Sequence, residues 1–140
     1  MGRVSKRGNS LRKTTGVQTE QNVKVRRYRA GIYARLSADH DERKNESVEV
    51  QIEIARKYVE EFNLKNTEEI IDIIDYYTDL GKTGSNLERE GFLRLLQDIR
   101  LGEINCVIVK DLSRFGRNYL EAGNYIEKIF PFLEVRFIAV

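Results

Sequence analysis

An arginine and a serine stand two residues apart in Tyr33-Ala34-Arg35-Leu36-Ser37, and together they have the chemistry to attack a phosphate. A serine hydroxyl is a nucleophile, and a guanidinium beside it can hold the phosphate oxygens that gain charge. Alternation along a strand would place Arg35 and Ser37 on the same side. Taken alone, the pentapeptide favours a turn serine beside a solvated arginine, because serine is common where strands end.

Two later polar segments also follow predicted strands and carry residues of the same chemical kind. The first begins with Asp79 and reaches Arg89, and the second holds Ser113, Arg114 and Arg117. Ligands of open α/β folds bind at the carboxyl ends of the strands. The three strand ends would therefore bring four arginines, one serine and one aspartate to a single crevice.

The remaining residue types exclude several other reactions. The only histidine, His40, lies in a polar stretch that reads as a loop, which argues against a Ser-His-Asp site built on Ser37. The segment Gly81-Lys82-Thr83-Gly84 resembles the end of a phosphate-binding loop, but Tyr76 stands where that loop needs its first glycine. No compact carboxylate cluster indicates a two-metal nuclease. The sequence thus favours phosphoryl transfer without a metal or another cofactor, with arginines stabilising the charge.

Composition indicates one globular domain of ordinary size. The chain has 140 residues, of which 33% are charged and 41% hydrophobic. The single cysteine, Cys106, lies in an apolar run and is predicted to be a small buried hydrophobe. No disulfide framework or Cys/His metal spacing is present, and no apolar run approaches the roughly 20 residues that span a bilayer. We expect a cytoplasmic protein without a membrane segment.

The charge is distributed unevenly along the chain. Residues 1–29 carry nine Lys/Arg against one acid, Glu20, while the rest of the chain is net acidic. Residues 1–27 are predicted to form a basic, flexible arm, which could also add non-specific affinity for nucleic acid. Residues 28–140 are predicted to form one domain. Because the sequence stops at a predicted strand, we expect this domain to be truncated at its C-terminal end.

Strand and helix signals alternate after the arm. The pattern predicts strands at 28–36, 69–78, 106–110 and 135–140, and helices at 47–62, 89–101 and 119–130. Gly102 is placed to end the second helix and Pro131 the third. This order predicts an α/β fold with a mostly parallel sheet and helices on both faces, in a flavodoxin-like layering.

Each predicted helix has an apolar stripe that should face the sheet. These positions are Val48, Ile52, Ala55, Val59 and Phe62 in the first helix, Phe92, Leu95, Leu96 and Ile99 in the second, and Leu120, Gly123, Ile126, Ile129 and Phe130 in the third.

Four motifs in order resemble the catalytic domain of serine recombinases, the resolvase/invertase family, and look most like the large serine recombinases of mobile elements such as transposons. The resemblance covers residues 28–140. The motifs are Tyr33-Ala34-Arg35-Leu36-Ser37, Ser47-Val48-Glu49-Val50-Gln51, Tyr77-Thr78-Asp79-Leu80-Gly81-Lys82-Thr83-Gly84 with Arg89, and Asp111-Leu112-Ser113-Arg114-Phe115-Gly116-Arg117-Asn118.

The resemblance implies that Ser37 attacks a DNA phosphodiester and forms a 5′-phosphoserine intermediate with a free 3′ hydroxyl. Arg35, Arg114 and Arg117 would bind the scissile phosphate and stabilise the transition state. Further active-site positions match Gln51, Asp79 and Arg89.

The resemblance also implies partners. Double-stranded DNA would be the substrate, and the full-length protein would act as a homo-oligomer, from dimer to tetramer, during DNA recombination or integration. Many relatives carry an aspartate where this chain has Ser113, while Asp79 is the one candidate general base. We expect this fragment to be inactive in recombination by itself. The alternative interpretation is a non-catalytic α/β module that binds a phosphate or a partner protein through its arginines.

Overall fold

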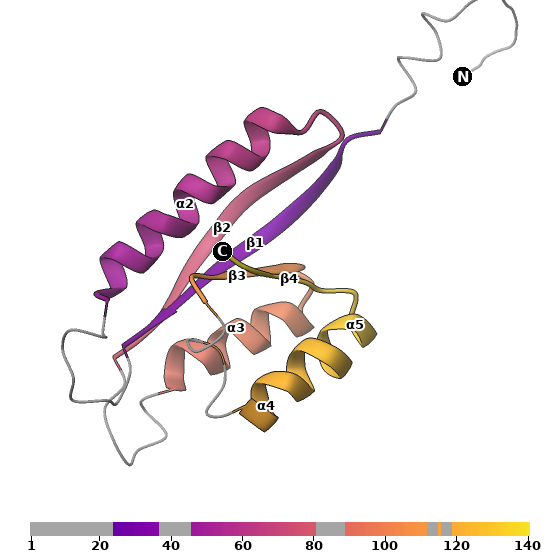
Figure 1. The fold of residues 1–140 in the computed structure, drawn as a ribbon. Helices are drawn as coiled ribbons and strands as arrows, with labels where there is room; N and C mark the ends of the chain where they lie inside the picture. Colours follow the sequence, from indigo (N-terminus) through magenta and orange to yellow (C-terminus); the bar gives the residue numbers. More distant parts are fainter. Residues whose placement is uncertain (1–23, 37–45, 81–88, 112–114, 116–118) are drawn as a thin grey trace, which may run out of the picture.

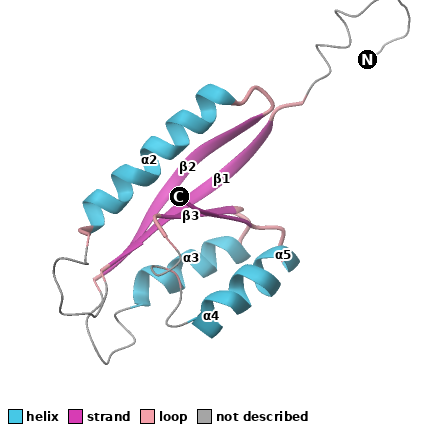
Figure 2. Cartoon of the chain, viewed as in Figure 1, coloured by secondary structure: helices cyan, strands magenta, loops and turns pink. Residues whose placement is uncertain are grey.

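A computed structural model describes residues 24–36, 46–80, 89–111, 115 and 119–140 of the chain. Strands and helices alternate along these residues, and the strands form one sheet (Figures 1 and 2). The elements are β1 (Arg26–Arg35), α2 (Val48–Lys65), β2 (Glu69–Asp79), α3 (Glu90–Arg100), β3 (Cys106–Val109), α4 (Tyr119–Asn124), a π-helical segment (Tyr125–Ile129), α5 (Phe130–Phe132) and β4 (Arg136–Ala139).

The four-stranded sheet has the order β2-β1-β3-β4, and all three strand pairs are parallel. Helix α2 covers one face, while α3, α4 and α5 cover the other (Figure 1). Parallel sheets need cover on both faces, which explains why the four residues of β3 are apolar and buried. The predicted α/β class with helices on both faces is confirmed.

The apolar stripe of the second helix is confirmed, and that of the first is confirmed except at Val48, which is half-buried at the start of α2. Ala55 and Val59 of α2 are buried against one face of the sheet, with Ile52 and Phe62 packed beside them. In α3 the buried positions include Phe92, Leu95, Leu96 and Ile99, the four that the spacing predicts. Gly102 ends that helix with a φ of +79°, a conformation that glycine adopts without strain.

The third helix departs from its prediction. It continues to Phe132, so Pro131 lies in its last turn instead of closing it. Leu120, predicted to face the sheet, is 87% exposed, whereas Ala122 is buried. The wider π-helical segment at Tyr125–Ile129 explains the difference, because it shifts the helix phase before Phe130.

A β-bulge in β2 changes which side chains face which layer. Ala30 of β1 pairs with Ile73, whereas the next residue, Gly31, pairs with Asp75. Ile74 is therefore an extra residue without a partner on β1. After the bulge, the odd-numbered residues of β2 face α3 instead of α2, and this change directs Asp79 toward α3.

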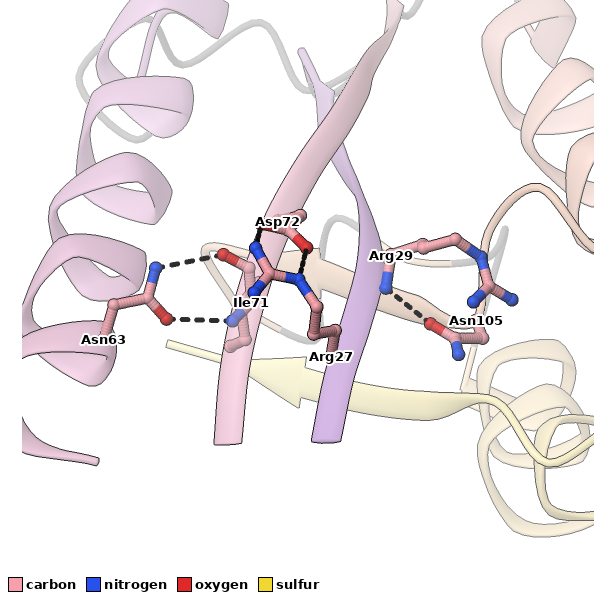
Figure 3. A network of polar contacts seen from close by, with 6 residues as sticks. All are labelled: Arg27, Arg29, Asn63, Ile71, Asp72 and Asn105. Carbon is pink, nitrogen blue, oxygen red and sulfur yellow. Dashed lines mark hydrogen bonds and ion pairs between the residues drawn. The ribbon is translucent and has the colours of Figure 1, made fainter. Parts of the chain in front are cut away.

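Side-chain hydrogen bonds stabilise the sheet near the starts of β1 and β2 (Figure 3). The Asn63 side chain on α2 accepts from Ile71 N at 2.8 Å and donates to Ile71 O at 3.0 Å. Asn63 thus occupies backbone groups on the free edge of β2 in place of another strand. Nearby, the Arg27 guanidinium donates to both oxygens of Asp72 at 3.0 Å.

Cys106 is a small core residue, as its apolar neighbours in the sequence predict. It is fully buried, and burial raises the pKa of its thiol to about 12. Within the described part of the chain, no helix has the length and apolar character needed to span a membrane.

Candidate active site

Four of the predicted site residues lie in the described part of the chain, at or near the carboxyl edge of the sheet. Arg35 is the last residue of β1, and Asp79 is the last residue of β2. The two are direct partners in the strand register. Arg89 stands immediately before α3, and Gln51 lies in the first turn of α2. Three further predicted residues, Ser37, Arg114 and Arg117, lie outside the described residues, as do His40 and Ser113.

The Asp79 carboxylate is buried and accepts three hydrogen bonds. Oδ1 accepts from Gly91 N at 2.7 Å, and Oδ2 accepts from Phe92 N at 3.0 Å and from the Tyr33 hydroxyl at 2.7 Å. The residue as a whole is only 3% exposed. Its oxygens are thus engaged with α3 and β1, which fits a group that positions its neighbours better than a base that accepts a substrate proton.

Asp79 acts as the N-terminal cap of α3 from a distance. The residue at the cap position is Arg89, whose side chain makes no capping hydrogen bond. The first N–H groups of a helix need acceptors, usually from a short polar side chain at the cap, and the Asp79 carboxylate supplies them here. A carboxylate at that end is also favoured by the helix dipole. Arg89 is therefore held beside the end of β2.

A glycine permits this close contact between α3 and β2. A Cβ atom built on Gly91 would lie 2.5 Å from Thr78 O and 2.9 Å from Thr78 N. Only a residue without a side chain lets the helix start this close to the strand. The short approach in turn brings the N–H of Gly91 within reach of Asp79.

Tyr33 connects the two arginine positions electrostatically. Burial and the hydrogen bond to Asp79 raise the pKa of the Tyr33 hydroxyl, so it stays protonated. The positive charges of Arg35 and Arg89 lower the pKa of this hydroxyl, but by less than burial and Asp79 raise it. Tyr33 thus binds the carboxylate that is in register with Arg35 and that caps the helix after Arg89.

Gln51 holds the backbone at the end of β1. Its Oε1 accepts from Arg35 N at 3.2 Å, and its Nε2 donates to Arg35 O at 3.0 Å and to Glu46 O at 2.9 Å. The side chain is buried, and the start of α2 that carries it is capped by the Ser47 hydroxyl, which accepts from Val50 N. Gln51 thus fixes the backbone position of Arg35.

Arg89 makes two further contacts. Its guanidinium donates to the Glu121 carboxylate through both terminal nitrogens, at 3.2 and 2.8 Å, and lies 4.3 Å from the centroid of the Phe92 ring. Sequence reasoning did not identify Glu121, because no local pattern links α4 to Arg89. Nor did it identify Tyr33 as a site residue, although Tyr33 belongs to the same pentapeptide as Arg35.

Charged groups also meet at the end of β3. The Lys110 ammonium pairs with Glu46 and, at 3.3 Å, with Asp111, and these acidic neighbours raise the pKa of Lys110. Because Gln51 binds the backbone of Glu46, the ends of β1 and β3 are connected through the start of α2. In the described residues, no group of three or more His, Cys, Asp or Glu is arranged to hold a metal ion.

Phe115 is an apolar anchor between the positions of Arg114 and Arg117 in the sequence. Its side chain is 1% exposed and packs edge-on against Phe92, Tyr125 and Phe137 and, at 6.4 Å, against Tyr33. This ring cluster lies between the sheet and the helices α3 and α4. It joins the segment that follows β3 to the end of β1.

The fold and the site define a class of protein. It is a parallel α/β domain with two arginines at the carboxyl edge of its sheet, where a buried carboxylate and a buried amide bind the backbone that carries them. Guanidinium groups bind phosphate oxygens through paired hydrogen bonds, so this edge suits a phosphate or phosphodiester ligand.

The comparisons with known proteins identify the family. The family model described as "Resolvase, N terminal domain" matches residues 30–140, and the chain belongs to this family of serine recombinases. Members of the family transfer DNA strands and bind DNA. No match was found among curated protein sequences.

Solved structures of recombinases share the fold. The N-terminal catalytic domain of TP901-1 integrase is 28% identical, with a TM-score of 0.62 over 79% of this chain and 75% of that one. A resolvase family site-specific recombinase from Streptococcus pneumoniae is 26% identical, with a TM-score of 0.61 over 81% and 72% of the two chains. The catalytic domain of ISC1926 TnpA, an IS607-like serine recombinase, shares the fold at 24% identity and a TM-score of 0.59, over 80% and 67%. The predicted family and resolvase-like fold are confirmed.

Proposed function

We propose that residues 28–140 are the catalytic domain of a longer site-specific DNA recombinase of a mobile element, with Ser37 as the nucleophile. The observation that carries the proposal is the position of Arg35. It ends β1 in register with the buried Asp79, and Gln51 holds its backbone, while Ser37 follows two residues later in the sequence. A guanidinium on a held backbone, next to a serine, suits attack on a phosphodiester.

The proposed reaction conserves the number of phosphoester bonds. The Ser37 hydroxyl gives up its proton as its oxygen attacks the phosphorus, a serine–phosphate ester forms, and the bond from phosphorus to the 3′ oxygen breaks. The 3′ oxygen leaves as a hydroxyl after taking up a proton, and the DNA 5′ end stays on the serine. Rejoining is the reverse attack by a 3′ hydroxyl. Because one ester replaces another, the exchange needs no nucleotide cofactor.

The arginines in this proposal bind the phosphate and stabilise its charge in the transition state. Arg35 lies at the end of β1, and Arg89 lies at the start of α3. Arg114 and Arg117 belong to the segment that follows β3 in the sequence. Asp79 and Gln51 act as positioning residues, since their polar groups are occupied by protein partners.

Three further parts of the proposal concern the whole protein. The basic residues that precede β1 in the sequence add affinity for the DNA backbone. The full-length protein works as a dimer that assembles into a tetramer on two DNA sites. It does so in the cytoplasm.

The test is to trap the covalent intermediate with the full-length protein. Labelled duplexes that span the two junctions of the mobile element are incubated with the protein, and adducts are separated under denaturing conditions. The wild type should form an adduct that Ser37→Ala does not form. Thr67→Ala is the matched control, because it removes a hydroxyl from an exposed residue between α2 and β2, at the end of the sheet away from Arg35, and should retain the adduct.

A second variant tests the guanidinium. Arg35→Lys keeps the positive charge but loses the planar pair of donors, so adduct formation should fall by roughly 10²-fold or more while the fold is retained. If Ser37→Ala still forms adducts, the assignment of the nucleophile is wrong. A wild type that binds DNA without any adduct would instead support the alternative, a non-catalytic phosphate-binding module.

A further inference from the structure

The ion pair between Arg89 and Glu121 differs from an ordinary surface pair. Both terminal nitrogens of Arg89 bind the two carboxylate oxygens of Glu121, and the side chains are only 17% and 28% exposed. By contrast, the Arg27–Asp72 pair at the other end of the sheet has side chains that are 59% and 39% exposed. A paired geometry with little solvent contact limits the orientations that the guanidinium can adopt.

Phe92 restricts Arg89 from a second direction. The guanidinium carbon lies 4.3 Å from the centroid of the Phe92 ring, so one face of the group rests on an aromatic surface. Phe92 is itself fixed, because its side chain is buried and its N–H is bound by Asp79. The Phe92 ring and the Glu121 carboxylate therefore restrict the position of the guanidinium together.

The pair also joins two segments that the proposed site requires. Arg89 stands at the start of α3, after β2, whereas Glu121 lies in the first turn of α4. In the sequence, α4 begins two residues after Arg117. The contact therefore connects the segment after β2 with the helix that directly follows the arginines after β3.

We propose that Glu121 is a positioning residue for the recombination reaction, and that it acts by orienting Arg89 toward the phosphate. This inference rests on the proposed function. Pairing with Glu121 uses one hydrogen of each terminal nitrogen of Arg89, so the pair does not itself occupy Nε–H or the remaining terminal hydrogens, which can donate to phosphate oxygens. Glu121 thus leaves the arginine its charge and its donors while fixing where they point.

The test uses the full-length protein with the same junction duplexes. Glu121→Ala should slow adduct formation by roughly 10- to 100-fold, because a misplaced catalytic group loses about that much rate. Glu127→Ala is the matched control, since Glu127 lies on the next turn of the same helix and is exposed. It should form adducts at the wild-type rate. Thermal unfolding of each variant shows how much stability has changed.

A double-mutant cycle separates positioning from a merely structural role. In an Arg89→Ala background, Glu121→Ala should cause no further loss of rate, because the group that it orients is gone. If the two losses multiply, Glu121 acts through something other than Arg89 and the inference is wrong. If Glu121→Ala fails to fold, Glu121→Gln carries the same cycle, as it keeps one acceptor for Arg89.

The outcome for Glu121 can be distinguished from the outcome for the proposed function. A wild-type protein that forms no covalent adduct contradicts the recombinase chemistry itself. A wild type that forms a Ser37-dependent adduct, together with Glu121→Ala at the wild-type rate, leaves the chemistry intact and overturns only the inference about Glu121.

Discussion

The Tyr33 hydroxyl donates a 2.7 Å hydrogen bond to Oδ2 of Asp79, and it joins residues that are 46 positions apart in the sequence. The same carboxylate holds the first N–H groups of α3. One buried carboxylate therefore sets the relative positions of β1, β2 and α3. Because Arg35 ends β1 and Arg89 precedes α3, the geometry of both arginines depends on it.

Asp79→Asn should destabilise the protein by about 2–4 kcal/mol. The amide nitrogen would replace one of two accepting oxygens and would face a backbone N–H in either orientation. Urea denaturation measures the loss. Asp72→Asn is the control, because its pair with Arg27 is exposed and should contribute at most about 1 kcal/mol. Equal losses for the two variants would contradict a capping role for Asp79.

Tyr33→Phe should cost about 1–2 kcal/mol at neutral pH, and this cost should shrink in alkali. Burial and the bond to Asp79 raise the pKa of Tyr33 in the folded protein above the ordinary value of about 10. The stabilisation is therefore complete below pH 10 and is lost as the pH rises above it, because the unfolded chain ionises first.

The phenylalanine variant lacks this contribution at every pH. Free energies of unfolding at pH 8 and pH 11 should show the difference between wild type and Tyr33→Phe becoming smaller. Tyr77, whose pKa is also raised, is present in both proteins and cancels in the comparison. A difference that stays constant between the two pH values would mean that the Tyr33 hydroxyl is not held as the structure indicates.

Local patterns in the sequence were sufficient to predict most of the secondary structure. Burial on both faces makes β3 a continuous apolar run of four residues, and burial on one face gives α3 an apolar stripe at helical spacing. Both patterns are visible in the sequence. The bulge at Ile74 and the π-helical segment at Tyr125–Ile129 were missed, since both change the phase of a pattern within an element. The exposed Leu120 is a direct consequence of that shift.

The candidate site was predictable in its location but only partly in its contacts. Strand ends carry Arg35 and Asp79 because a parallel sheet gathers its carboxyl ends at one edge. The pairing of Arg89 with Glu121 was not predictable, because the two are 32 positions apart and either could have faced solvent. The roles of Ser37, Arg114 and Arg117 stay predictions.

Gly91→Ala should destabilise the protein by about 1–3 kcal/mol. The added Cβ would lie 2.5 Å from the Thr78 oxygen, so α3 would have to move away from β2 and from Asp79. Gly123→Ala is the matched control, as a Cβ there has no atom within 4 Å. In a helix it should be neutral or stabilise by up to about 1 kcal/mol. Chemical denaturation of both variants checks the contrast, and similar behaviour would contradict it.

Asn63→Asp should weaken the attachment of α2 to the edge of the sheet by about 1–3 kcal/mol. The aspartate can still accept from Ile71 N, but its second oxygen would face Ile71 O, where the asparagine now donates. Asn124→Asp changes the same group at an exposed position and should alter stability by no more than about 0.5 kcal/mol. Hydrogen exchange at Ile71 N should also become faster in the first variant only.

Phe115→Leu should impair DNA cleavage more than its loss of stability explains. The ring is buried against Phe92, Tyr125 and Phe137, and Phe115 stands between Arg114 and Arg117 in the sequence. Leucine keeps an apolar anchor but loses the edge-on ring contacts, which should cost about 1–3 kcal/mol. If the anchor positions the two arginines, adduct formation should fall by roughly 10- to 100-fold.

Val59→Ala provides the control for Phe115→Leu. Val59 is buried between α2 and the opposite face of the sheet, so its truncation should cost a similar free energy without touching the ring cluster. Adduct formation at a temperature where both variants are fully folded separates the two effects. Val59→Ala should retain the wild-type rate, since it changes stability alone. If both variants lose rate in proportion to stability, Phe115 is an ordinary core residue and does not position the arginines.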